Sequence, residues 1–101
     1  MRVTLKGRAN NDIREIRKYL SEFGQNQPKK FLAAFKTFRR QVAAMPYMFN
    51  LFEYNPRYRV ATIIYDYLVF YRVEDGVIKV IRVLHSSRNT IHILDEENGR
   101  P

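Results

Sequence analysis

The sequence predicts an α+β fold in which an antiparallel sheet of about four strands carries an N-terminal helical hairpin on one face. Apolar residues recur at helical spacing in two segments before residue 46, whereas three segments after residue 57 are rich in Val, Ile, Tyr and Phe. Strands that follow helices, rather than alternate with them, favour antiparallel pairing with the helices on one side. The expected order is β-α-α-β-β-β, to which residues 89–94 can add a short C-terminal helix.

The length of the chain indicates one domain. A chain of 101 residues can bury a single hydrophobic core without a disulfide or a metal ion. We expect this domain to span residues 1–94. The remaining residues, 95–101, begin with three consecutive acids and are predicted to form a flexible acidic tail.

The first strand and the first helix have separate signals. Residues 2–5 alternate in polarity and are predicted to form a short strand. The first helix is expected over residues 10–23, because Asp12 and Glu15 have the spacing of a capping box. Its apolar positions follow at helical spacing: Ile13, Ile16, Leu20 and Phe23.

The second helix is bounded by two prolines. Pro28 suits the first turn of a helix, and Pro46 ends the helix at Met45. A short link separates the two helices, so they are expected to lie antiparallel. One continuous apolar stripe runs along the second helix and predicts its buried face: Phe31, Phe35, Phe38, Val42 and Met45.

Three strands are expected in the second half, after a loop over residues 47–56. They span residues 58–64, 67–74 and 77–85. The dipeptide Asp75-Gly76 favours a type I′ hairpin that pairs Glu74 with Val77 and, further along, Phe70 with Ile81. A tight turn at residues 65–66 would place Ala61 beside Phe70.

This register assigns the two faces of the sheet. Ala61, Phe70 and Ile81 form the better apolar face, which we expect under the helices. Tyr67 and Tyr71 fall on the other face, beside Val69 and Arg82, and form an exposed amphipathic surface. At the far end of the apolar face lies a row of three cations, which is either an anion site or a solvated sheet tip: Arg59, Arg72 and Lys79.

Charge gives the first indication of function. Eighteen Lys and Arg against ten Asp and Glu give a net charge of +8, and residues 1–94 carry 17 basic against 7 acidic groups. A field of this sign attracts polyanions such as nucleic acid, the ribosome or an acidic protein, although solubility alone is the simpler explanation. With no cysteine and no run of about 20 apolar residues, we expect a cytoplasmic protein without a membrane span. Two histidines make a metal site improbable, and we expect no cofactor.

Two motifs in the last third resemble the RelE/ParE toxin superfamily of type II toxin–antitoxin systems. They are the strand Tyr67-Leu68-Val69-Phe70-Tyr71-Arg72-Val73 and the ending Arg82-Val83-Leu84-His85-Ser86-Ser87-Arg88-Asn89. The order of elements over residues 1–94 matches the family fold. The resemblance implies a growth-inhibiting toxin with a cognate antitoxin as its partner. RelE-like members cut mRNA on the ribosome, whereas ParE-like members poison DNA gyrase.

The resemblance also implies candidate catalytic residues. A RelE-like endonuclease is metal-independent and combines basic groups with an acid–base residue. That role falls here on Arg82, His85 and Arg88, with Arg57, Arg59, Arg72 and Lys79 as candidates for binding nucleic acid or another target. Two departures weaken this assignment: Leu68 stands where the nuclease branch has an arginine, and residues 91–93 lack its aromatic residue. A histidine at a strand end is also more often structural than catalytic.

A further set of residues is a candidate contact surface for the antitoxin or the target. The second helix has five cations and no acid, so it offers a basic face, although a solvated helix looks the same. The set comprises Lys29, Lys30, Lys36, Arg39, Arg40, Tyr67 and Tyr71. The sequence favours a ParE-like gyrase inhibitor. A RelE-like mRNA interferase and a non-toxic basic RNA-binding module stay open as alternatives.

Overall fold

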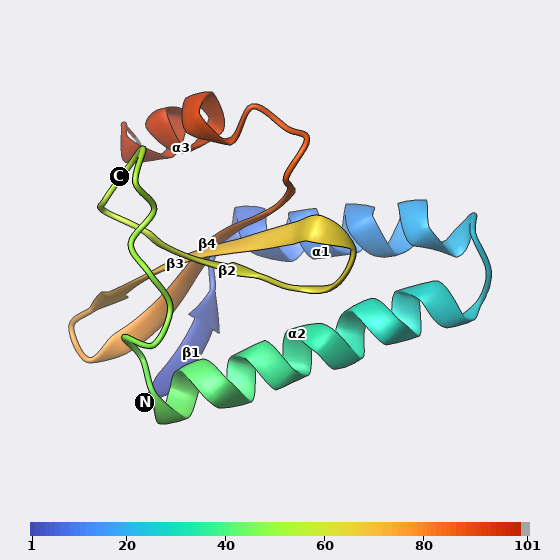
Figure 1. The fold of residues 1–101 in the computed structure, drawn as a ribbon, viewed down its shortest axis with the longest axis horizontal. Helices are drawn as coiled ribbons and strands as arrows, with labels where there is room; N and C mark the ends of the chain where they lie inside the picture. The colour runs from blue at the N-terminus through green and yellow to red at the C-terminus, as the bar shows by residue number, and fades with distance from the viewer. Residues whose placement is uncertain (100–101) are drawn as a thin grey trace.

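The computed structural model describes residues 1–99, which form a four-stranded sheet with helices on both faces (Figure 1). The α+β class and the predicted order of elements are confirmed. The elements are β1 (Arg2–Leu5), α1 (Gly7–Ser21), α2 (Asn26–Ala44), β2 (Arg59–Thr62), the 3-10 turn η1 (Ile64–Asp66), β3 (Tyr67–Glu74), β4 (Val77–His85) and α3 (Thr90–Asn98). None of the described helices is long and apolar enough to cross a membrane.

The sheet is mostly antiparallel but contains one parallel pair. Its strand order is β1-β4-β3-β2, in which β1 runs parallel to β4 and the other two pairs are antiparallel. The expectation of a purely antiparallel sheet therefore needs this correction. Short turns fix the directions of β2, β3 and β4. The helical hairpin and the other strands separate β1 from β4, so no local signal specified their relative direction.

The hairpin at Asp75-Gly76 forms as predicted, but its register changes further along. Asp75 and Gly76 have φ values of +55° and +72°, as a type I′ turn requires, and Glu74 pairs with Val77. A bulge between Phe70 and Tyr71 then shifts the pairing, so that Phe70 lies beside Arg82 instead of Ile81.

The pairing of β2 with β3 also differs by one residue from the prediction. The predicted two-residue turn is a three-residue 3-10 turn, closed by a hydrogen bond from the Ile63 N–H to the Tyr67 carbonyl at 2.8 Å. Ala61 consequently lies beside Val69 instead of Phe70.

These shifts reverse the predicted faces of β3. Phe70 and Ile81 face away from the helical hairpin, whereas Tyr67, Val69 and Tyr71 lie beneath it. The expectation that Tyr67 and Tyr71 form an exposed surface is wrong, because their relative exposures are 5% and 0%. Both faces of the sheet are covered, so neither is the exposed amphipathic surface that the alternation of residues suggested.

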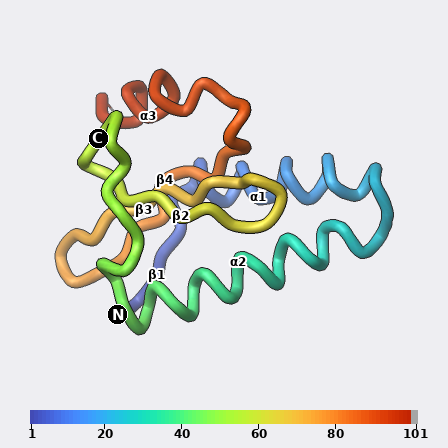
Figure 2. The backbone as a smooth tube through the Cα atoms, in the orientation of Figure 1, coloured from blue at the N-terminus to red at the C-terminus, as the bar shows by residue number. Residues whose placement is uncertain are grey.

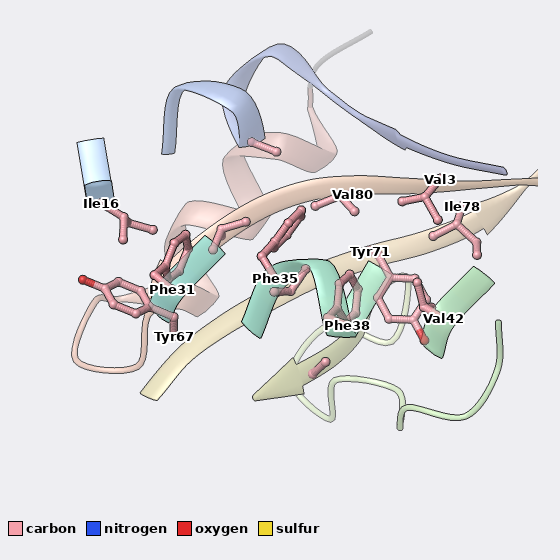
Figure 3. Close-up of a cluster of buried hydrophobic side chains, with 14 of the residues drawn as sticks. Val3, Ile16, Phe31, Phe35, Phe38, Val42, Tyr67, Tyr71, Ile78 and Val80 are labelled. Atoms are coloured by element: carbon pink, nitrogen blue, oxygen red, sulfur yellow. The ribbon is translucent and has the colours of Figure 1, made fainter. Parts of the chain in front are cut away.

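The main core lies between the helical hairpin and the sheet. The stripe predicted on α2 is buried there, and Figure 3 shows Phe31, Phe35 and Phe38 directed at the strands. Phe31 meets the ring of Tyr67 edge-on at a centroid distance of 5.3 Å, and Phe38 meets Tyr71 at 5.8 Å. Each fully buried aromatic side chain contributes about 1.5–3 kcal/mol through removal of apolar area from water. Met45 is the exception in the stripe, because it lies past the end of α2 and is exposed.

A second cluster covers the opposite face of the sheet. Leu94 of α3 packs there with Tyr58, Phe70, Ile81 and Leu84. Figure 2 shows the segment between α2 and β2 passing from the hairpin side of the sheet to the side of α3. This segment brings Tyr58 to the cluster, where its hydroxyl donates a 2.7 Å hydrogen bond to Asn98.

The boundary predicted for the acidic tail is corrected by α3. Residues 95–98 are helical, not part of a flexible tail, and residues 100–101 lie outside the described residues. The Asn89 side chain caps α3 by accepting a hydrogen bond from the backbone N–H of His92. Glu97, which the sequence placed in the tail, has a side chain only 10% exposed and is held by two arginines. This ion pairing and the burial of Leu94 explain why the helix continues to Asn98.

Candidate functional site

The arginine that begins the C-terminal motif is enclosed by carboxylates. Arg82 Nε and Nη2 donate to the two oxygens of Asp12, at 2.7 Å and 2.9 Å. Its Nη1 donates to Glu97 Oε1 at 3.2 Å, and Arg8 Nε lies 3.4 Å from the same oxygen. Asp12 also accepts the backbone N–H of Val83 at 2.9 Å. The cluster thus joins α1, β4 and α3.

The environment of Arg82 makes it a structural cation. Its side chain is 12% exposed, and the hydrogen bonds that it donates to Asp12 raise the pKa of Arg82 despite the opposing effect of burial. Asp12 serves this cluster and does not cap α1, since the helix begins at Gly7 with Lys6 as its cap. Three guanidinium N–H groups are directed at carboxylates, so Arg82 has little capacity left for a phosphate.

His85 is fixed at the end of β4. Its Nδ1 lies 3.1 Å from the backbone N–H of Ser87, which donates to it, and 2.8 Å from the Ser87 hydroxyl. Nδ1 thus serves as an acceptor, and in the tautomer compatible with this contact the ring proton is on Nε2. The ring stands edge-on to Tyr67 at a centroid distance of 5.1 Å. His85 is half-buried and keeps Nε2 for a partner.

A shallow cleft brings the three candidate catalytic residues into one region. Arg82, His85 and Arg88 line it together with Asn11 and Glu15 of α1. Arg88 is exposed and has no carboxylate within ion-pair distance among residues 1–99, whereas Arg82 is neutralised. Only His85 and Arg88 remain accessible from this trio.

The predicted row of cations at the sheet end does not assemble. Because of the shifted register, Arg59 lies beside Tyr71 on the helical face, whereas Arg72 pairs with Lys79. Arg59 donates to the Phe49 carbonyl at 2.9 Å, and its guanidinium lies 5.0 Å from the ring centroid of Tyr47.

The other two members of the row share one carboxylate. Lys79 Nζ donates to Glu74 at 2.8 Å, and Arg72 Nε lies 3.2 Å from the same side chain without hydrogen-bond geometry. This end of the sheet therefore has two cations around one carboxylate, which partly neutralises their positive charge. Arg57 is exposed in the loop before β2, apart from this pair.

The five cations of α2 lie on the exposed side of the helix. Among residues 1–99 none has a carboxylate within ion-pair distance. Within the described part of the chain Arg39 alone has a hydrogen-bond partner among these five, since it donates to the Val3 carbonyl at 3.0 Å. The exposed set comprises Lys29, Lys30, Lys36, Arg39 and Arg40.

An apolar groove that the sequence did not reveal lies next to His85. Its volume is about 500 Å³, and Leu20 and Tyr67 lie among its lining residues. Three aromatic side chains lining it are strongly exposed: Tyr19 at 55%, Phe23 at 59% and Tyr65 at 38%. The hydroxyl of Tyr65 is hydrogen-bonded to Gln27 of α2.

The helical periodicity is misleading at this groove. Phe23 continues the apolar spacing of the predicted first helix, but α1 ends at Ser21 and the ring is exposed. Tyr65 has a φ of +59°, which is unusual for a bulky residue and turns its ring toward the groove. The available signal was the spacing of four between Tyr19 and Phe23, whose rings lie edge-on at a centroid distance of 5.2 Å.

The family is identified by a sequence match over most of the chain. The model described as ParE toxin of type II toxin-antitoxin system, parDE, matches residues 3–90. The chain belongs to the ParE toxin family. The family resemblance inferred from the two C-terminal motifs is therefore confirmed.

A solved structure supports the fold of this ParE-family chain. A chain from the chromosomal ParDE TA system of P. aeruginosa superposes with a TM-score of 0.61 at 20% sequence identity. The superposition covers 84% of this chain and 95% of the other. Among curated proteins, no relative matches the sequence. Among residues 1–99, no three His, Cys, Asp or Glu side chains gather as a metal site.

Proposed function

We propose that this ParE-family chain is a growth-inhibiting toxin that binds and inhibits DNA gyrase in the cytoplasm, and that a cognate antitoxin neutralises it. Membership of the family supports the role of toxin. The observation that carries the choice of gyrase is the enclosure of Arg82 by Asp12 and Glu97. A toxin that acts by binding needs no free phosphate-stabilising arginine at this position.

The pairing of Arg82 with carboxylates argues against metal-independent RNA cleavage by this residue. Such a reaction needs a cation free to contact the phosphate, placed next to an acid–base group. Arg82 makes its hydrogen bonds to carboxylates. Leu68, at the position where the nuclease branch has an arginine, packs against the second apolar cluster. The accessible groups left in this cleft are His85 and Arg88.

The groove beside His85 supports binding of a protein partner. Aromatic side chains that are exposed around a hollow are typical anchors in protein interfaces. Tyr19, Phe23 and Tyr65 provide such anchors, and His85 offers a polar contact at the rim. Tyr67 contributes to the lining of the groove and is not an exposed contact.

One alternative retains a specific observation in its favour. His85 and Arg88 share an accessible cleft, so a ribosome-dependent mRNA endonuclease using these two residues is the second candidate. His85 would then move the proton through Nε2, and Arg88 would contact the phosphate.

Two assays on the purified chain separate these candidates. The first measures supercoiling of relaxed plasmid by DNA gyrase as the chain is titrated. The second maps cleavage of mRNA on translating ribosomes by primer extension. We expect inhibition of supercoiling with intact mRNA. Cut mRNA with unaffected gyrase, abolished by His85→Ala/Arg88→Ala, would establish the endonuclease instead.

A further inference from the structure

The positive charge of the chain is concentrated in the helical hairpin. Residues 7–44 contain nine Lys and Arg against three Asp and Glu, a net charge of +6 out of +8 for the whole chain. One of the three acids, Asp12, is engaged by Arg82. Arg8 is engaged by Glu97 in turn, so the other groups of the hairpin, eight basic and two acidic, keep a net charge of +6.

The cations of α2 form a straight stripe. With about 100° of rotation per residue, Lys29, Lys36 and Arg40 fall within an arc of about 40°, on the side opposite the buried phenylalanines. The stripe extends about 16 Å along the helix axis, from eleven residues at about 1.5 Å each. Because successive phosphates of one DNA strand advance about 3.4 Å along the duplex axis, this length spans about five phosphates.

The stripe continues onto α1 near the hairpin turn. Arg14, Arg17 and Lys18 line a hollow of about 290 Å³ together with Ser21 and with Pro28 of α2. All three cations are exposed, and none has a carboxylate within ion-pair distance among residues 1–99. Figure 1 shows α1 and α2 antiparallel and joined by this turn, so one ligand can reach both helices.

The start of α2 adds to the positive potential. Lys29 and Lys30 stand in its early turns, no acid is present there, and no side chain caps the helix. Cations at the positive end of a helix dipole are unfavourable for the free protein. An anion bound over this end would relieve the repulsion.

The chemistry of this face favours phosphate over a peptide. Interfaces with proteins depend on buried apolar anchors, and the residues between the cations of the stripe are the half-buried Leu32 together with Ala33 and Thr37, with no aromatic side chain. The apolar anchors of the molecule lie elsewhere, around the groove of Tyr19, Phe23 and Tyr65. Contacts from Lys and Arg alone suit the sequence-independent recognition of a nucleic-acid backbone.

We infer that the outer face of the hairpin binds the phosphate backbone of duplex DNA. In the proposed function the face would contact DNA held by gyrase while the apolar groove contacts protein. Only this placement on gyrase-bound DNA rests on the proposed function. Two separate surfaces would then favour the gyrase–DNA complex over either component alone.

The test measures binding of a fluorescently labelled 30-base-pair duplex to the full chain by anisotropy at several salt concentrations. The variant Lys36→Gln/Arg40→Gln removes two cations of the stripe. The control Arg2→Gln/Lys6→Gln removes two exposed cations outside the helices and has the same net charge. Circular dichroism verifies that both variants are folded.

We expect the Lys36/Arg40 variant to bind on the order of tenfold more weakly at about 0.1 M salt, with a salt slope smaller by about 2. The control should lose less than about threefold. Equal losses in both variants, or no binding by the wild type at low salt, would overturn the inference. So would tighter, stripe-dependent binding of a polyglutamate peptide. The assay contains no gyrase, so the inference and the gyrase proposal can fail independently.

Discussion

Arg82 on β4 and Asp12 on α1 form a double hydrogen bond across 70 residues of sequence, at 2.7 Å and 2.9 Å. The parallel geometry is that of a bidentate arginine–carboxylate pair. Because both side chains are nearly buried, the pair fixes the first helix against the last strand beside the cleft that His85 and Arg88 line.

Removal of the Asp12 charge should destabilise the protein strongly. Asp12→Asn leaves the guanidinium of Arg82 with one carboxylate, in a site that is 12% exposed. Breaking one partner of a buried pair costs about 3–5 kcal/mol, and Glu97 should keep the loss near the lower end. The free energy of unfolding in urea measures this effect. The exposed neighbour provides the control: Glu15→Gln should change it by less than about 0.5 kcal/mol. Equal effects of the two substitutions would contradict a structural role for the pair.

The anchoring of α3 depends on Glu97. Glu97→Gln weakens the contacts to Arg82 and Arg8 and should increase hydrogen exchange in α3 more than in β3 or β4. Glu96→Gln is the matched control, since among residues 1–99 Glu96 is ion-paired with His92 alone and its side chain is 55% exposed. Hydrogen exchange followed by mass spectrometry distinguishes the two. Unchanged protection of α3 in Glu97→Gln would show that apolar burial of Leu94 alone holds the helix.

The register of β3 predicts two different effects at Tyr71. Its hydroxyl donates to the Pro46 carbonyl at 2.8 Å, and its ring is fully buried. Tyr71→Phe should therefore cost about 1 kcal/mol for the lost hydrogen bond, and Tyr71→Ala about 3–5 kcal/mol for the lost packing. Thermal and urea unfolding measure both. A loss below about 1 kcal/mol for Tyr71→Ala would indicate an exposed ring and the register first expected from the sequence.

Strand β3 shows why the sequence predicted the elements but not their faces. Periodicity located both helices and the three later strands, and Asp75-Gly76 fixed the hairpin as far as Tyr71 and Val80. Residues 67–71 are apolar or aromatic at every position, because helices cover both faces of the sheet. Alternation is then absent, and a bulge or a longer turn leaves no trace in the pattern.

The candidate site was predictable in part. The motif groups Arg82, His85 and Arg88, and all three line one cleft. The pairing of Arg82 with Asp12 was not predictable, because it depends on how α1 packs against β4, and the spacing of Asp12 and Glu15 suggested a helix cap instead. The aromatic groove was hidden for a related reason: Phe23 fits the helical period but lies beyond the last turn.

The ion pair at the sheet tip predicts a shift in pH titration. The hydrogen bond from Lys79, followed by the charge of Arg72, lowers the pKa of Glu74 below its ordinary value of 4.5. Because the pKa is lower in the folded state, the contribution to stability is present at neutral pH and is lost as pH falls through the folded-state pKa. Lys79→Gln should raise the pKa of Glu74 toward 4.5, as measured by NMR of its carboxyl carbon. Lys36→Gln should leave it unchanged. An unchanged pKa in Lys79→Gln would show that the contact does not form in solution.

A substitution at the rim of the apolar groove should weaken partner binding without lowering the free energy of unfolding. Phe23 is 59% exposed at the rim, so Phe23→Ser removes little buried area and should change the free energy of unfolding by less than about 0.5 kcal/mol. If the groove binds a protein partner, the same change removes an aromatic anchor worth about 2 kcal/mol or more, a loss of about thirtyfold in affinity. Tyr54→Ser is the matched control, because Tyr54 is 60% exposed and lies in the loop before β2, outside the groove.

Inhibition of gyrase supercoiling and relief of toxicity by the co-expressed antitoxin measure the two partner interactions separately. Loss of gyrase inhibition in Phe23→Ser alone, with rescue by the antitoxin unaffected, assigns the groove to gyrase. Failure of the antitoxin to rescue cells, with inhibition intact, assigns it to the antitoxin. Equal behaviour of Phe23→Ser and Tyr54→Ser in both assays would remove the groove from partner binding. The exposed rings would then be a surface feature of the α1 terminus without a role in recognition.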